Sequence, residues 1–256
     1  MDEFVEDQCR AMNDRVGNLK GYDCGECKNK GVVYVIQDRD IRVRECKCAG
    51  IRKDIRRIRE SRLGESLNRC TFETFNTGTK LQNRMKELAL QFTDEVKSGK
   101  GKWLFAGGQP GAGKTHLCTA ITGYLLRSGM RARYMLWNAE AIKIKACITE
   151  SRDYDSLVEP LKNCNVLYID DFFKSVRDEK NELKNPSPAD IRLAFEIINH
   201  RYNQSDSVTI ISSELRLDEI IAIDEAIGSR IFERAQGYIL NIPYKKEYNY
   251  RLRKDE

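Results

Sequence analysis

The chain lacks any long apolar run. No stretch of its 256 residues approaches the ~20 consecutive apolar residues that a membrane-spanning helix needs, which argues against a membrane protein. The amino terminus, MDEFVEDQCR, is acidic and has no basic region followed by an apolar core, so it does not show the pattern of a secretory signal. We therefore expect a cytoplasmic protein with no membrane partner.

The chain also lacks a strong excess of charge of one sign. Its net charge is +5, although 32% of its residues are charged, which is typical of a folded protein with a very polar surface. The charge is uneven, because the segment from Arg39 to Arg69 contains eleven Lys or Arg and five Asp or Glu. Such a basic block favours binding to a phosphate backbone or an acidic protein surface, but a solvent-exposed charged helix has the same composition.

Nine cysteines are present, and the expected cytoplasmic location argues against a disulfide framework. Four of them form two close pairs, Cys24-x-x-Cys27 and Cys46-x-Cys48. The intervening segments 31–37 and 41–46 have the composition of two short strands joined by a polar turn, so a hairpin would bring the pairs together. This layout predicts a zinc ribbon with a closed, structural site of four thiolates. An iron–sulfur cluster would use the same ligands, and four ordinary cysteines are the remaining alternative.

A basic helix and a linker are expected next. Ile51, Ile55 and Ile58 recur at helical spacing, so one apolar stripe would face a partner while the arginines face outward over residues 51–67. The segment 68–80 loses this period and carries two aromatic residues in a polar stretch, which we interpret as a linker. The predicted organisation is therefore a zinc-ribbon-like module over residues 1–50, a basic helix and linker over 51–80, and a main domain over 81–256, whose motifs follow.

The stretch GGQPGAGKTHL carries the most specific motif of the chain. Gly108-x4-Gly113-Lys114-Thr115 follows an apolar segment (101–108) and precedes a segment of helical spacing that ends at Gly129, which is the context of a Walker A phosphate loop. Backbone amides and the helix amino terminus would bind the phosphates of ATP or ADP, and Lys114 would reach the terminal phosphates. The residues expected to contact the nucleotide here are Gly108, Gly111, Ala112, Gly113, Lys114, Thr115 and His116.

A second motif, NVLYIDD, supplies the acids that hydrolysis of a phosphoanhydride requires. A buried strand is expected to end at Asp170-Asp171. Asp170 and the hydroxyl of Thr115 would ligate Mg²⁺, and Asp171 would orient or deprotonate the attacking water. Lys114, Asp170 and Asp171 are therefore candidate catalytic residues.

The remaining body alternates strands and helices as a parallel sheet demands. Strands are expected at 131–137, 207–212 and 237–242, and helices at 139–150 (capped by Asn138), 154–161 and 188–204, with two short helices before Ala235. Together with the strands of the two motifs these give a five-stranded parallel sheet between helices. The fold class is thus an α/β P-loop nucleoside triphosphatase core with a small zinc-ribbon-like domain at the amino terminus.

The order of GQPGAGKTHL, LYIDDFFK, TIISSELRLDEI, GSRIFERAQG and YNYRLRK behind a Cys-x-x-Cys…Cys-x-Cys module resembles the helicase loaders of the DnaC/DnaI type, found in bacteria and phages. The resemblance covers nearly the whole chain and implies an AAA+ ATPase. It further implies that the zinc module and the basic helix bind a hexameric replicative DNA helicase, and that the ATPase domain self-assembles and senses single-stranded DNA. Such a protein delivers the helicase onto single-stranded DNA during replication initiation.

The resemblance also assigns residues. Ser212 or Ser213 would be the sensor of the γ-phosphate, although the family frequently has Asn in this stretch. Arg230 matches the arginine finger, which acts on the nucleotide of the neighbouring subunit and is a further catalytic candidate, and Arg234 would be a second basic contact. Arg251 is the candidate second sensor. The aromatic residues of the segment FFKS (172–175) would either stack on single-stranded bases or belong to the core.

Three alternative functions remain open on the sequence. A transposition-helper AAA+ ATPase of the IstB type shares the ATPase body, but its relatives generally lack the thiolate ribbon. A small-molecule kinase would need an arginine-rich lid, for which the candidate segment RDEKNELKNP (177–186) has one Arg. A non-enzymatic zinc adaptor would bind ATP without hydrolysing it. Asp171 is compatible with this alternative, because Glu is commoner at the position that activates the attacking water.

Overall fold

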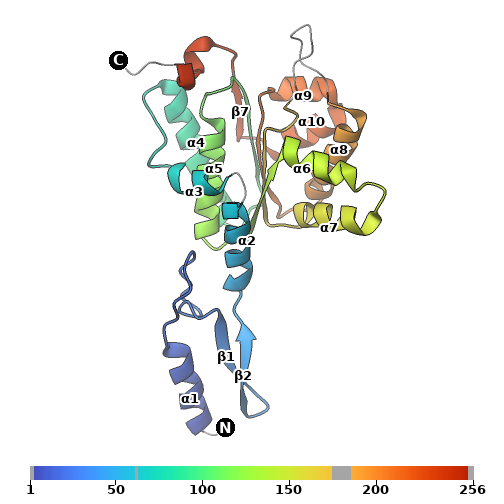
Figure 1. Ribbon diagram of the computed structural model, residues 1–256. Helices are drawn as coiled ribbons and strands as arrows, with labels where there is room; N and C mark the ends of the chain where they lie inside the picture. The colour runs from blue at the N-terminus through green and yellow to red at the C-terminus, as the bar shows by residue number, and fades with distance from the viewer. Residues whose placement is uncertain (1–2, 61–62, 175–185, 253–256) are drawn as a thin grey trace.

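The computed structural model describes residues 3–60, 63–174 and 186–252. These residues form a three-layer ATPase body and a smaller amino-terminal module that projects from it (Figure 1). Ser175 and residues 177–185 of the segment considered as a lid under the kinase alternative lie outside the described residues. Within the described part, no helix combines the length and the apolar character that crossing a bilayer requires.

The body contains a five-stranded sheet in which every neighbouring pair is parallel, in the order β4-β5-β6-β3-β7. The expected α/β fold with a five-stranded parallel sheet is therefore confirmed. The central strands are buried on both faces, as parallel strands between two helical layers must be. The strands are β3 (Trp103–Gly108), β4 (Ala132–Leu136), β5 (Val166–Asp170), β6 (Val208–Ser212) and β7 (Ile239–Ile242).

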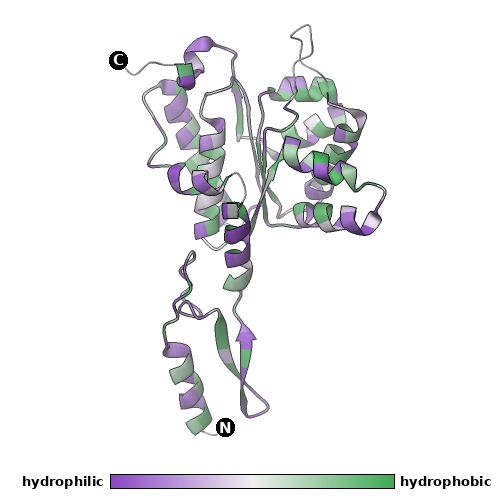
Figure 2. Cartoon of the chain, in the orientation of Figure 1, coloured by the Kyte–Doolittle hydropathy of each residue, from purple (hydrophilic) through white to green (hydrophobic). Residues whose placement is uncertain are grey.

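Helices cover both faces of this sheet (Figure 1). One layer contains α2 (Cys48–Glu60), α3 (Gly64–Arg69), α4 (Lys80–Lys97) and α5 (Lys114–Arg127). The other contains α6 (Trp137–Ala146), α7 (Ser151–Lys162), α8 (Pro188–Tyr202), α9 (Leu217–Ile223) and α10 (Glu225–Arg234). Green apolar and purple polar segments alternate along these helices in Figure 2, as expected for helices that bury one side.

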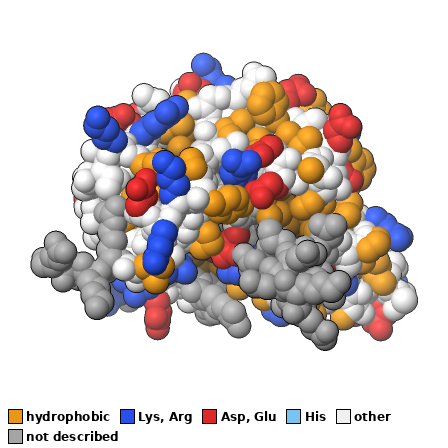
Figure 3. Space-filling view, turned by 90° about the horizontal axis from the view of Figure 1, so that it is seen from above, with side chains coloured by type: hydrophobic (Ala, Val, Ile, Leu, Met, Phe, Trp, Pro, Cys, Tyr) orange, Lys and Arg blue, Asp and Glu red, His pale blue; other side chains and the backbone are white. Residues whose placement is uncertain are grey.

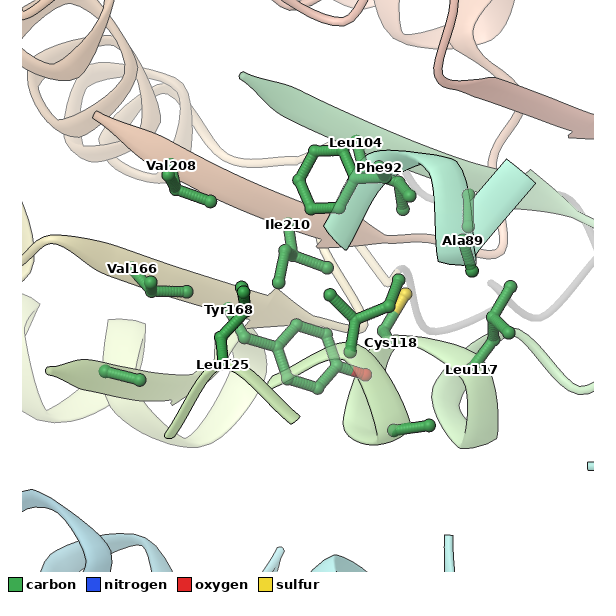
Figure 4. Close-up of a cluster of buried hydrophobic side chains, with 14 of the residues drawn as sticks. Ala89, Phe92, Leu104, Leu117, Cys118, Leu125, Val166, Tyr168, Val208 and Ile210 are labelled. Atoms are coloured by element: carbon green, nitrogen blue, oxygen red, sulfur yellow. The ribbon is translucent and has the colours of Figure 1, made fainter. Parts of the chain in front are cut away.

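Alternate residues of each strand supply the two cores, because successive side chains of a strand point to opposite faces. Leu104, Tyr168 and Ile210 pack with Phe92 of α4 and Leu117 of α5 in the first core (Figure 4). The neighbouring strand residues, such as Phe105, Leu167 and Ile211, pack against α6 to α10 in the second core. These two cores fix the loops that follow the carboxyl ends of β3, β5 and β6.

The expected basic helix is present, but its partner is the body of the same chain. Ile51, Ile55 and Ile58 of α2 are buried in the first core. Asp54, which is 2% exposed, binds Arg131 just before β4 with an Nε–Oδ2 distance of 3.0 Å. The predicted continuous helix over 51–67 is wrong, since α2 ends at Glu60 and α3 is separate.

The segment 68–80 is more ordered than a linker needs to be. Phe72 and Phe75 are buried in the first core, where Phe72 contacts the ring of Tyr124 and Phe75 that of His116. The segment therefore packs on the helix that follows the phosphate loop. Thr79 ends it as the cap of α4, where its hydroxyl accepts a hydrogen bond from the Gln82 amide. The domain boundaries at residues 50 and 80 remain predictions.

The amino-terminal module consists of α1 (Glu3–Asp14), which the sequence analysis did not predict, and the predicted hairpin of β1 (Val32–Gln37) and β2 (Asp40–Glu45). Its own apolar cluster is small and consists largely of the four cysteines, with Val33 and the half-buried Tyr22. Cys48 is both a member of this cluster and the first residue of α2. The module and the body are therefore connected through a continuous helix.

Other elements differ from expectation in their ends. The small helix predicted at 154–161 is the longer α7, and the described part of the chain ends with two short 3₁₀ helices, η1 (Lys246–Tyr248) and η2 (Tyr250–Leu252). Asn138 is not a helix cap, because α6 begins at Trp137 directly after β4 and its preceding residue makes no side-chain cap. The helix thus starts two residues earlier than expected, and the buried ring of its first residue, Trp137, packs on Phe172.

Candidate nucleotide site and cysteine cluster

The phosphate loop lies between β3 and α5, and its glycines are required by the backbone. Gly108 has a φ of 100°, and a Cβ there would lie 2.0 Å from the carbonyl oxygen of Ile242. Gly111 has a φ of 76°, and its Cβ would meet Oδ1 of Asn249 at 2.0 Å. Only glycine relieves both restrictions. The loop can therefore curl tightly at the amino terminus of α5, where unpaired amides and the helix dipole favour an anion.

Lys114 is the first residue of α5 and is 7% exposed. Its ammonium donates hydrogen bonds to the carbonyl oxygens of Gly108 at 2.7 Å and Gln109 at 2.8 Å, so it is held over the loop. Burial lowers the pKa of Lys114 to about 8, because desolvation disfavours the charged form. A bound phosphate would favour the charged form and raise this pKa again.

Asp170 at the end of β5 collects hydrogen bonds from three other elements. Its Oδ1 accepts from the Thr115 hydroxyl at 3.2 Å and from the Ser212 hydroxyl, and its Oδ2 accepts from the Tyr134 hydroxyl at 3.2 Å. A hydroxyl and a carboxylate at this separation fit a common Mg²⁺ shell. Tyr134 of β4 was not predicted as a site residue, because nothing in its local sequence indicates that it lies opposite Asp170.

These residues line a pocket of about 370 Å³, within the range of small-ligand sites. The predicted residues on its wall are Gly111, Gly113, Lys114, Thr115, His116, Asp170, Asp171, Ser212 and Arg251. The wall also contains Pro110, Lys174 and Glu214, which the sequence analysis did not assign. Lys174 and Glu214 follow β5 and β6, and the carboxyl ends of parallel strands are where ligands of such sheets bind. Their place directly after predicted strands could have indicated both residues as candidates for the site.

Several predicted site residues lie elsewhere. Gly108 and Ala112 belong to the loop but not to the pocket wall. Of the two candidate sensors, Ser212 faces the pocket, whereas the Ser213 hydroxyl donates to the carbonyl oxygen of Phe172 at 2.7 Å. His116 lines the pocket with its ring beside Phe75, and its Nε2 is 3.1 Å from the carbonyl oxygen of Thr71.

Arg230 on α10 does not line the pocket of its own chain. Its guanidinium donates to Oδ1 of Asn199 at 3.0 Å and lies over the rings of Phe195 and Tyr202. Action on a neighbouring subunit therefore remains a prediction. Arg234 is committed to its own chain, where it donates to backbone carbonyls that include Gln204 and lies 5.8 Å from the Trp103 ring centroid.

The DNA-stacking alternative for the segment 172–175 is wrong. Phe172 and Phe173 are 0% and 1% exposed, and their rings stack on each other with centroids 4.1 Å apart. Both rings also meet Trp137 edge to face. They belong to the second core and hold the backbone that carries Asp171.

The four cysteines of the amino-terminal module come together as predicted. The sulfur atoms of Cys24 and Cys46 are 3.7 Å apart, those of Cys27 and Cys48 are 3.6 Å apart, and all four lie within 4.8 Å of one another. These separations are too long for disulfides, but they match the edge of about 3.8 Å of a tetrahedron with Zn–S bonds of about 2.3 Å.

Burial and the close approach of the four sulfur atoms disfavour four thiolates that no cation compensates. Burial raises the pKa of Cys46. Burial acts in the same direction on Cys27, but the Gly31 amide, 3.3 Å from its sulfur, and the neighbouring thiols lower the Cys27 pKa. All four side chains are buried. A zinc ion would compensate the charge of four thiolates in this environment, so the donor set fits the metal.

Residues 67–235, more than half of the chain, match the family described as the bacterial DnaA ATPase domain. The chain is 29% identical over 245 residues to the phage-like element PBSX protein XkdC of Bacillus subtilis (strain 168), which covers 90% of this chain and 86% of XkdC.

Solved structures share the fold. The crystal structure of the DnaC helicase loader superposes with a TM-score of 0.55 at 24% identity and covers 70% of this chain and 98% of DnaC. AMPPCP-bound DnaA from Aquifex aeolicus gives a TM-score of 0.52 at 20% identity, with 69% of this chain and 50% of DnaA covered. The chain thus belongs to the bacterial DnaA ATPase domain family of AAA+ ATPases, and its fold is similar to that of a DnaC-type loader.

Proposed function

We propose that this protein binds and hydrolyses ATP to load a hexameric replicative DNA helicase onto single-stranded DNA. The observation that carries the ATPase part is the contact between Thr115 of the phosphate loop and Asp170 at the end of β5. The two residues come from separate loops, and their oxygen atoms converge on one point beside Lys114. This is the arrangement that a magnesium-bound nucleotide requires.

The residues of the pocket have separate roles in this proposal. The amides of residues 111–116 and the ammonium of Lys114 bind the phosphates, and Ser212 holds Asp170 in place. Thr115 and Asp170 would hold Mg²⁺, which supplies neutralisation of the charge that develops on the transferred phosphoryl group. Asp171 orients the attacking water, and Arg230 of a neighbouring subunit completes the site, so that hydrolysis depends on assembly.

The loader part is supported by the amino-terminal module. One of the solved structures with a similar fold is that of a helicase loader, and the module projects away from the ATPase body (Figure 1). Its surface carries apolar side chains, such as Phe4 at 73% and Val43 at 63% exposure, which a partner protein would cover. The four cysteines would hold Zn²⁺ and keep this surface folded.

Single-stranded DNA is the expected second ligand of the body. In the face shown in Figure 3, Lys and Arg side chains are interspersed with Asp and Glu side chains, so that view offers no continuous basic surface. We expect the assembled oligomer, which the proposed role of Arg230 requires, to bind the DNA.

Native mass spectrometry with ATP and a candidate hexameric helicase tests the proposal. We expect a complex that contains the helicase, one zinc ion per loader chain and a bound nucleotide. Cys27→Ser should lose the helicase and the metal but retain the nucleotide. Lys114→Ala should lose the nucleotide but retain the helicase and the metal. Failure to bind any hexameric helicase, together with retention by a transposase, would replace the loader with a transposition-helper ATPase.

A further inference from the structure

Three charged side chains in the nucleotide pocket form a unit, and the proposed function gives a role to only one of them, Asp171. The ammonium of Lys174 lies 3.1 Å from Oδ2 of Asp171 and 3.2 Å from Oε1 of Glu214. Asp171 and Lys174 come from the loop after β5, and Glu214 comes from the loop after β6. Lys174 therefore bridges two carboxylates across the pocket edge of adjacent strands.

The backbone of Asp171 and the side chain of Lys174 differ in how firmly they are held. The backbone around Asp171 is fixed, because the amide of Phe172 donates to the carbonyl oxygen of Ser212 at 2.9 Å and the Phe172 ring is buried in the second core. The hydroxyl of Ser213 binds the carbonyl oxygen of Phe172 from the same side. Lys174 instead reaches the acids through a flexible four-carbon side chain that is 37% exposed. The ammonium is the movable member of the unit.

The charges of the pocket are balanced before a nucleotide arrives. Its wall carries three acids, Asp170, Asp171 and Glu214, and three bases, Lys114, Lys174 and Arg251. A triphosphate brings more negative charge than one magnesium ion neutralises, and it competes with the two carboxylates for the Lys174 ammonium. A diphosphate lacks the third phosphate that would compete for Lys174, whereas both nucleotides have phosphates for Lys114 to bind.

We propose that Lys174 distinguishes ATP from ADP: it neutralises Asp171 and Glu214 in the free protein and moves onto the terminal phosphate of a bound triphosphate. This inference rests on the proposed function, since it requires ATP in the pocket of Lys114. The move frees Asp171 to orient the attacking water only when a third phosphate is present. Glu214 is the competing partner that sets how readily the ammonium leaves.

Binding affinities for AMPPCP, which is not hydrolysed, and for ADP test this in the full-length protein. Lys174→Met removes the charge and keeps the side-chain length. It should weaken AMPPCP binding by about tenfold to a hundredfold, the range for one hydrogen bond to a charged group, and leave ADP binding unchanged. Lys174→Arg should restore part of the AMPPCP affinity. An equal loss for both nucleotides, or no loss for either, would overturn the proposal.

A matched control and a double-mutant cycle sharpen the result. Lys102 is 34% exposed, pairs with one acid (Glu95), and precedes β3 at the opposite edge of the sheet, so Lys102→Met should leave both affinities unchanged. Glu214→Gln should tighten AMPPCP binding in the wild-type background and have a smaller effect beside Lys174→Met. An equal effect of Glu214→Gln in both backgrounds would contradict competition for the ammonium. If the wild type binds neither nucleotide, the proposed function itself fails, whereas binding of both with an unchanged ratio in Lys174→Met refutes only the role of Lys174.

Discussion

The nucleotide pocket and the cysteine cluster hold their functional side chains by different means. The pocket stands on strands such as β3, whose six residues are all buried, and on two apolar cores that cover both faces of the sheet. The cysteine cluster has few apolar neighbours beyond Val33 and Tyr22. Core packing therefore positions Asp170 and Lys114, while bonds to a metal would position the four thiolates. The two regions should respond differently to the same perturbations.

Metal removal should have the largest effect, and it should affect one region alone. Structural zinc contributes ~10–16 kcal/mol of apparent binding free energy in small finger peptides, so a chelator should unfold the hairpin of β1 and β2. Hydrogen exchange followed by mass spectrometry should show loss of protection there and unchanged protection in β5. Equal protection of β1 with and without the chelator would mean that the apolar cluster is sufficient by itself.

A core substitution should have the converse effect. Phe172→Ala removes a ring with no exposed surface from the second core and should cost about 3–5 kcal/mol of unfolding free energy of the body. Chemical denaturation measures this loss. Phe4→Ala, at a side chain that is 73% exposed, serves as the control and should change stability by less than about 0.5 kcal/mol. A mild effect of Phe172→Ala would contradict its place in the core.

Lys114→Ala tests whether the pocket depends on its buried cation. The variant loses charged hydrogen bonds to the phosphates, so ATP binding should weaken by about a hundredfold or more, as measured by isothermal titration calorimetry. Zinc content should stay the same, because the cysteine cluster is remote from Lys114. Wild-type affinity in this variant would place the nucleotide elsewhere.

The smallest expected effect concerns pH. Because burial lowers the pKa of Lys114 to about 8, the free protein loses this charge as pH rises above 8, and ATP binding must then take up a proton. The affinity should fall by at most about tenfold per pH unit above pH 8, and this group should contribute no pH dependence below that value. Calorimetry at pH 9 in buffers of different ionisation enthalpy detects the proton. Lys114→Arg keeps its charge and should bind ATP with no such uptake.

Much of the body could be predicted because its signals are local. The phosphate loop needs glycines at fixed positions, and a buried strand that ends in Asp170-Asp171 is recognisable without knowledge of the fold. The cysteine pairs are equally local, since their spacing and the hairpin between them bring the sulfurs together. The α/β class followed from the alternation of these segments.

The remaining features depend on tertiary contacts. Phe72 and Phe75 stand in a polar stretch, and their burial depends on the helix that follows the phosphate loop. The choice of Ser212 over Ser213 depends on where β6 ends and which way its last side chains point. Lys174 and Glu214 meet only because β5 and β6 are neighbours in the sheet. Arg230 would act in an assembly, which one chain does not contain.

The continuity of α2 has a mechanical consequence. The helix begins at the cluster residue Cys48 and runs for thirteen residues, a length of about 20 Å, and its isoleucines and Asp54 contact the body along that length. No loop interrupts α2 between the cysteine cluster and the body. The adjacent strand β4 carries Tyr134, whose hydroxyl donates to Asp170. Force from a partner protein bound at the cysteine end would therefore be transmitted through α2 to β4, the strand next to the one that carries Asp170.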